Sequence, residues 1–190
     1  MGGTWGRLRR KRTDRTGGVG LQTYIALLRG INVGGTGLLP MTELVELCTA
    51  LKFEGVRTYI QSGNVLLQSA LSEDKVRSAL EKSLEARMGK KISVMVRTAG
   101  EMKEVLAANP FPDREANKTG VAFLCDAPPH DLAERTVAPA GELVHPGKRE
   151  IYIYYPIGMG QSRLKLPLKG AAATIRNINT VAKLVALSAG

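Results

Sequence analysis

The stretch VRTYIQSGNVLLQ, residues 56–68, decides the fold of the first half of the chain. Ser62-Gly63-Asn64 is a turn signal between two runs that are rich in apolar and β-branched residues, a pattern typical of a β-hairpin. The segments on either side of this hairpin then determine which sheet its two strands join.

Strand and helix patterns alternate on both sides of the hairpin. Before it, the apolar run QTYIALL at 22–28 predicts a buried strand, and the segment after Pro40 predicts an amphipathic helix. After it, residues 72–89 begin with a capping serine and end with a glycine suited to a helix C-terminus, and 92–96 alternate as a strand. The order β-α-β-β-α-β predicts a ferredoxin-like, or split βαβ, first lobe.

The second half partly repeats this order, although no sequence repeat accompanies it. Thr98-Ala-Gly-Glu101 is a capping box that opens a third helix, and the polar segment 111–118 is predicted as a hinge. The elements expected after it are strands at 121–125, 143–145 and 150–155, and short helices at 131–137, 161–169 and 174–188. We therefore predict an α+β protein with two lobes. These are a ferredoxin-like lobe at 21–110 and a smaller α+β lobe with C-terminal helices at 111–190.

The charge of the chain indicates an anionic partner. The net charge is +10, and half of it lies in residues 1–20, which hold six basic residues and one acidic residue. This aperiodic segment is predicted to be a disordered basic tail. The alternative is a nucleic-acid arm that binds phosphates by counterion release. The range 151–190 holds five basic residues and no Asp or Glu, which also favours an anion site.

Composition limits the class of protein. Hydrophobic residues make up 44% of the 190 residues, enough for a packed core. The two cysteines, Cys48 and Cys125, imply no disulfide framework and favour a reducing compartment. No apolar run approaches the roughly 20 residues that span a bilayer, and the basic N-terminal segment lacks the apolar core of a secretory signal. We therefore expect a cytoplasmic protein without a membrane partner.

Three segments combine arginine with amide residues, and the first two of them also contain glycine. They are YIALLRGINVGG at 24–35, RTYIQSGNV at 57–65 and ATIRNINTV at 173–181. Their combination resembles a bacterial family known only as domain of unknown function 1697, over about residues 23–188. The resemblance implies a two-lobed α+β protein with a ferredoxin-like first lobe, and it implies no activity. The family usually has Trp where this chain has Ile178 and often Lys where it has Thr36, so neither residue type is expected to be essential here.

The glycine-rich range 30–37 is the first candidate for anion binding. It follows a predicted strand and precedes a predicted helix, where backbone N–H groups can receive a phosphate. Arg29 and Asn32 would add a guanidinium group and an amide beside it. The range has neither the Walker A spacing nor the dinucleotide-binding spacing, and its alternative role is simply to turn the chain.

Two further polar sets complete the candidate site. Gln61 and Asn64 lie at the hairpin turn, where the alternative is that they bond their own backbone. Arg176 lies at the expected start of the last helix, where a cation opposes the macrodipole unless a negative group is near. An internal acid such as Glu43 would instead make an ordinary salt bridge with it. We predict that at least two of the three pairs, Arg29 with Asn32, Gln61 with Asn64, and Arg176 with Asn177, meet in a cleft between the lobes. The candidate residues are Arg29, Asn32, Gly34, Gly35, Gln61, Asn64, Arg163, Arg176 and Asn177.

The sequence leaves three functions open. The leading one is a protein that binds a phosphate-bearing ligand or nucleic acid in a basic cleft. The second is an enzyme acting on a phosphorylated small molecule, with Arg29, Arg163 and Arg176 as an anion clamp and His145 as a proton carrier. The third is an interaction protein whose basic end docks an acidic partner. The spacing of the cysteines and histidines predicts no metal site. No feature identifies a cofactor, a catalytic residue or an oligomeric state.

Overall fold

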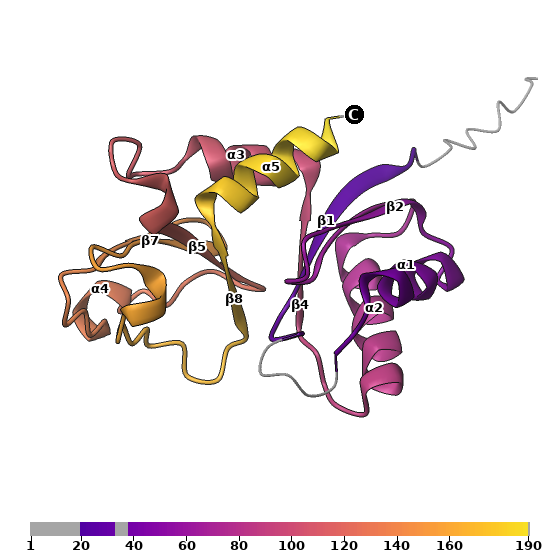
Figure 1. The fold of residues 1–190 in the computed structure, drawn as a ribbon, viewed down its shortest axis with the longest axis horizontal. Coiled ribbons are helices and arrows are strands. Elements are labelled where there is room, and N and C mark those ends of the chain that lie inside the picture. The colour runs from indigo at the N-terminus through magenta and orange to yellow at the C-terminus, as the bar shows by residue number, and fades with distance from the viewer. Residues whose placement is uncertain (1–19, 33–37, 190) are drawn as a thin grey trace, which may run out of the picture.

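Figure 1 shows the computed structural model, which describes residues 20–32 and 38–189. Nearly all of the predicted tail, as well as Gly34 and Gly35, lies outside these residues. Each lobe contains one four-stranded antiparallel sheet. No helix in the described ranges is long and apolar enough to cross a membrane.

The first lobe has the predicted ferredoxin-like order. Its strands run β2-β3-β1-β4 across the sheet, and every neighbouring pair is antiparallel. Helices α1 and α2 provide the two crossovers and cover one face. The elements are β1 (Gln22–Leu28), α1 (Met41–Ala50), β2 (Glu54–Tyr59), β3 (Asn64–Ser69), α2 (Glu73–Met88) and β4 (Val94–Thr98).

The second lobe repeats the strand order of the first. Its sheet runs β6-β7-β5-β8, so the first strand of the lobe is again central and the last lies beside it. The crossovers are reduced: α4 has four residues, and a loop containing η2 takes the place of a second helix. The elements are β5 (Thr119–Leu124), α4 (Leu132–Arg135), β6 (Leu143–Pro146), β7 (Glu150–Tyr154), η2 (Met159–Gln161) and β8 (Ala173–Asn177).

Each sheet is followed directly by a helix, and these two helices join the lobes. Helix α3 (Ala99–Ala107) follows β4 and α5 (Ile178–Ser188) follows β8. Figure 1 shows them lying together across the interface between the sheets. Thr98 caps α3 through the predicted capping box, and Asn177 caps α5 by accepting a hydrogen bond from the Asn179 N–H.

Two predictions for the C-terminal region are wrong. The range 161–169 begins with the last residue of η2 and continues as a loop rather than a helix. Leu164, Leu166 and Leu168 alternate toward the second sheet with a period of two, which a helix would not allow. The range 174–177 belongs to β8, where it pairs with β5, so the last helix begins only at Ile178. Arg176 therefore lies in a strand and does not face a helix macrodipole.

Most of the core lies in three layers. One covers the outer face of the first sheet and includes Cys48, whose thiol pKa burial raises to about 12. Another lies on the outer face of the second sheet under the 159–168 loop. The third, which we call the shared core, joins both sheets with α3 and α5. Its buried members are Ile25, Leu27, Leu66, Met95, Met102, Val105, Val121, Phe123, Tyr152, Ile178, Val181 and Leu184.

The connection between the lobes packs against the second sheet. Its 3₁₀ turn η1 (Ala116–Lys118) leads into β5. The Tyr154 hydroxyl donates to the Glu115 carboxylate at 2.5 Å, and the Phe111 ring lies 6.4 Å from the Tyr154 ring. The shared core and these contacts together hold the lobes side by side.

Candidate functional site

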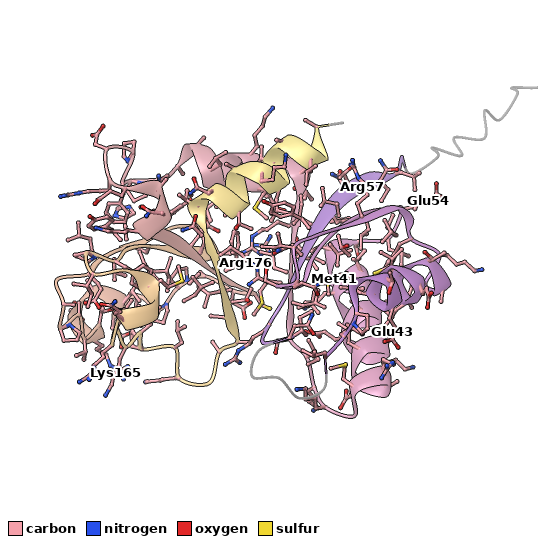
Figure 2. All side chains as sticks on the ribbon, in the orientation of Figure 1. Met41, Glu43, Glu54, Arg57, Lys165 and Arg176 are labelled. Carbon is pink, nitrogen blue, oxygen red and sulfur yellow. The ribbon has the colours of Figure 1, made fainter. Side chains whose placement is uncertain are left out.

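Arg176 crosses from the second lobe into the first. It lies in β8 opposite Val121, and its guanidinium group reaches the end of β1 and the β2–β3 turn. Its Nε donates to the Asn64 Oδ1 at 2.6 Å, and its Nη2 donates to the carbonyls of Leu28 and Ser62, both at 2.9 Å. Figure 2 labels Arg176 near the centre of the molecule, and it is only 7% exposed.

The partners of Arg176 are all neutral. Its Nη1 donates to the Thr174 hydroxyl and the Ile175 carbonyl, so every N–H of the guanidinium group has an acceptor. None of the acceptors found in the described residues is a carboxylate. Burial lowers the pKa of Arg176 to about 10. Glu43, the predicted alternative partner, instead binds Arg87.

Asn32 connects the base of the glycine-rich range to the same turn. Its side-chain Nδ2 donates to the carbonyls of Gln61 and Leu39 at 3.0 Å, and its Oδ1 accepts from the Leu39 N–H at 2.7 Å. Asn32 has a φ of 57°, a left-handed conformation that asparagine tolerates better than most residues. Its amide is thus engaged with backbone, and Gln61 contributes its carbonyl to the contact.

The predicted site residues are only partly gathered. Asn64 contacts Arg176, and Asn32 contacts Gln61, at neighbouring points of one junction between the lobes. Asn177 turns away, because its Nδ2 donates to the carbonyls of Ala116 and Asn117 in the connection. Arg29 and Arg163 are exposed.

A second arginine, which the sequence reasoning missed, makes the reverse crossing. Arg97 lies in β4 opposite Ile25 and is 1% exposed. Its Nη2 donates to the carbonyls of Leu124 at 2.8 Å and Arg149 at 2.7 Å, both in the second lobe. In each lobe the arginine directly precedes the residue that caps the following helix: Arg97 precedes Thr98, and Arg176 precedes Asn177. An arginine followed by a helix-capping residue was therefore the sequence signal that could have identified Arg97.

The two arginines occupy equivalent positions. Leu28 ends β1 and Leu124 ends β5, so each arginine binds the last carbonyl of the other lobe's central strand. Asn64 pairs with Leu27 in the first sheet, as Glu150 pairs with Phe123 in the second. The equivalent neighbour of Arg97 is therefore a carboxylate, which lies 3.8 Å from its Nη2.

A pocket of about 400 Å³ lies beside Arg97, between α3 and the β6–β7 hairpin. We call it the interlobe pocket. Val105 and Tyr152 belong to its apolar lining, and the Tyr152 hydroxyl is satisfied by the Val105 carbonyl at 2.8 Å. Ala108, His145 and Lys148 also line it, and all three are exposed. This volume and lining are typical of a small-molecule site.

The interlobe pocket reflects a difference between the two hairpins. Tyr59 pairs with Asn64, and the Gly147 N–H donates to the Glu150 carbonyl, so Tyr59 and Gly147 are equivalent. Tyr59 packs against the shared core, whereas Gly147 has no side chain to do so. A Cβ at Gly147 would lie 2.5 Å from the Glu150 Oε1, so a larger residue does not fit there without rearrangement.

Charged residues of both signs surround the interlobe pocket. Arg149 binds Glu73 with both terminal nitrogens, at 2.6 and 3.0 Å, and Glu101 at 2.8 Å. These carboxylates raise the Arg149 pKa, chiefly through the hydrogen bonds that Arg149 donates to Glu73. Lys148 Nζ lies 2.7 Å from the Glu104 Oε2 on α3. The described residues contain no group of three His, Cys, Asp or Glu placed to hold a metal ion.

Comparison with known proteins supports the fold and identifies the family. The conserved bacterial protein SP0830 from Streptococcus pneumoniae has a similar structure, with a TM-score of 0.71 and 23% sequence identity. The match covers 89% of this chain and 99% of that one. No curated protein matches the chain significantly. The family described as protein of unknown function DUF1697 matches residues 21–152, well over half of the sequence. The chain therefore belongs to the DUF1697 family.

Proposed function

We propose that the protein binds a small phosphate-bearing ligand in the interlobe pocket. The observation that carries the proposal is the asymmetry of the two hairpins, since a pocket lies at Gly147 where the equivalent Tyr59 packs against the core. Pockets between packed units, with an apolar floor and a few charged groups, are the usual sites for such ligands.

His145 and Lys148 are the groups proposed to hold the phosphate. Both are exposed and line the interlobe pocket from the second lobe. The pair between Lys148 and Glu104 is largely exposed, and such pairs are worth little, so a phosphate can replace the carboxylate on Lys148. Arg97 and Arg149 are engaged with protein acceptors and would contribute through their field.

The anion site predicted from the sequence is a competing location for the same function. Arg29 and Arg163 are exposed and could bind phosphate, while all the donors of Arg176 are occupied by neutral groups. The described residues of that predicted site, which the structure gathers only in part, are Arg29, Asn32, Gln61, Asn64, Arg163, Arg176 and Asn177.

Binding of a small molecule is favoured over nucleic acid at the interlobe pocket. Glu101, Glu104 and Glu150 line it, and these carboxylates would repel a polyphosphate backbone. The enzyme alternative shares only His145 with the interlobe pocket, because its predicted clamp of Arg29, Arg163 and Arg176 does not line it. His145 could there move a proton to or from a bound phosphate ester.

Isothermal titration calorimetry tests the proposal with inorganic phosphate, ribose 5-phosphate and adenosine 5′-monophosphate. Ala108→Phe should fill the interlobe pocket and abolish binding, and Lys148→Ala should weaken it by about tenfold, as expected for one charged hydrogen bond. Ala107→Phe and Lys103→Ala are matched controls on the same helix, because both residues are exposed and neither lines the pocket.

The outcomes separate the two locations. Binding that survives Ala108→Phe but is lost in Arg29→Ala or Arg163→Ala would place the phosphate at the site predicted from the sequence. Absence of binding for all three probes would refute the proposed function. Turnover of a bound ester that depends on His145 would favour the enzyme.

A further inference from the structure

The Lys148–Glu104 pair joins opposite walls of the interlobe pocket. Glu104 projects from α3, which follows the first sheet, and Lys148 from the β6–β7 turn of the second. Their side chains are 63% and 83% exposed, so solvent already surrounds both charged ends. A ligand that enters between them therefore competes only with a weak pair.

Glu104 is the carboxylate from which a bound phosphate would take its protein donor. Glu101 keeps Arg149 and the Thr98 N–H and hydroxyl as donors. Glu150 accepts from the backbone N–H groups of Lys148 and Arg149. Glu104, in contrast, binds Lys148 through one oxygen, and the phosphate would take that lysine. A phosphate and a carboxylate would then face each other across one pocket, which is unfavourable.

We infer, on the basis of the proposed function, that the ligand is a phosphate ester whose other end carries an amino group. The phosphate replaces Glu104 on Lys148, and the amino group donates to the released Glu104 carboxylate. The exchange leaves each charge with an opposite or hydrogen-bonding partner. Ala108 and Pro146 provide an exposed apolar surface for the body of the ligand, which favours a flat ring between its two polar ends.

The inference makes Glu104 the residue that determines specificity. It contacts the amino end, while Lys148 and His145 contact the phosphate end. Removing Glu104 therefore has opposite effects on two classes of ligand. An amino-bearing ester loses an acceptor, whereas an ester without the amino group is relieved of a repulsion.

Two nucleotides that differ by one amino group provide the test. Adenosine 5′-monophosphate carries the amino group, and purine riboside 5′-monophosphate lacks only that group. Titration calorimetry of the full chain should give a dissociation constant about tenfold lower for the adenosine compound, the value of one hydrogen bond to a charged acceptor. In Glu104→Ala the ratio should fall to about one, with purine riboside 5′-monophosphate binding more tightly than to the unaltered protein.

Glu85→Ala is the matched control. It removes the same charge from an exposed position on α2 that does not line the interlobe pocket, so the tenfold ratio should persist. Equal binding of the two nucleotides by the unaltered protein, or a ratio that survives Glu104→Ala, would overturn the inference and leave the proposed function standing. If no phosphate ester binds, the proposed function itself fails.

Discussion

The two lobes share a strand order and exchange equivalent arginines, but they neutralise these arginines differently. Arg97 enters the second lobe beside Glu150, and Arg176 enters the first lobe beside Asn64. Both guanidinium groups bind the last carbonyl of the opposite central strand at similar distances, 2.8 and 2.9 Å. One backbone geometry can therefore hold a buried cation beside a carboxylate or among neutral acceptors alone.

The charged neighbourhood of Arg97 is also where the interlobe pocket lies. On that side four carboxylates and three basic residues meet, supplied by α2, α3, β4 and the β6–β7 hairpin. The Arg176 side uses Asn64 and backbone carbonyls, and Tyr59 packs where Gly147 lies in the other lobe. The Arg176 side therefore resembles a packed structural contact between the lobes, and the Arg97 side retains the space and charge that a ligand requires.

The largest effect is expected when Arg97 is replaced. Arg97→Met leaves Glu150, which is 5% exposed, without its nearest cation. Loss of one member of a buried pair typically costs about 3–5 kcal/mol of unfolding free energy. Urea unfolding of the variant measures this loss, with Arg135→Met as a control in an exposed pair. A loss below about 1 kcal/mol would show that Glu150 is satisfied by its backbone donors alone.

Arg176→Met should cost less than Arg97→Met. It strands the Leu28 and Ser62 carbonyls and the Asn64 amide oxygen but no carboxylate, so we expect about 1–3 kcal/mol. The same urea titration gives the comparison directly. A loss of unfolding free energy equal to or larger than that of Arg97→Met would show that the carboxylate beside Arg97 does not make that arginine the more important of the two.

Tyr59→Ala should open a space in the first lobe at the position equivalent to the interlobe pocket. The side chain is half-buried against the shared core, so its loss should cost about 2 kcal/mol, roughly half the cost of truncating a fully buried aromatic residue. A crystal structure of the variant should show a new hollow beside β3, equivalent to the interlobe pocket. Closure of this space by neighbouring side chains would contradict the proposed relation between Gly147 and the pocket.

The two helix caps should differ slightly. Thr98→Ala and Asn177→Ala each remove a side-chain acceptor at a helix start and should cost about 1 kcal/mol. We expect the larger loss for Thr98, because its capping box also engages Glu101. Thermal unfolding monitored by circular dichroism resolves the difference. A larger loss for Asn177 would indicate that its bonds to the connection outweigh the cap.

The smallest effect is the contribution of Glu101, on the Arg97 side, to the acid dependence of stability. Burial acts to raise the pKa of Glu101, but hydrogen bonds from Thr98 and the nearby Arg149 outweigh it and lower the pKa. A lowered pKa in the folded state gives stability that is present above the unfolded value, about 4.3, and is lost as the pH falls through the folded value. Glu101→Gln should therefore have a shallower loss of stability between pH 5 and pH 3. An unchanged slope would assign the acid dependence to other carboxylates.

Local patterns in the sequence predicted the first lobe well. The turn at Ser62-Gly63-Asn64, the apolar run at 22–28 and the capping box at Thr98 each determine their own segment with few competing conformations. The family resemblance is confirmed as well. Strand β8 was missed because its pairing with β5 depends on residues about fifty positions away, while its β-branched residues directly precede a true helix.

The candidate site was harder to predict because it depends on register. Arg176 was recognised as unusual, but its partners, the carbonyls of Leu28 and Ser62, have no side-chain signature. The sequence did not predict the interlobe pocket, because the equivalence of Gly147 and Tyr59 depends on the register of two different sheets. Neither a sequence motif nor hydrophobic periodicity indicates that Gly147 lacks the side chain found at the equivalent position of the first lobe.

The shared core has a consequence for the order in which the chain is synthesised. The first sheet is complete at Thr98, but Leu184, which helps to cover its inner face, emerges 86 residues later. At a synthesis rate of about 5–20 residues per second, Ile25 and Leu27 therefore remain without this part of their packing for roughly 4–17 s. A nascent chain that ends near residue 110 would present this face to chaperones, and a hydrophobic dye should bind a purified 20–110 fragment more strongly than the whole protein.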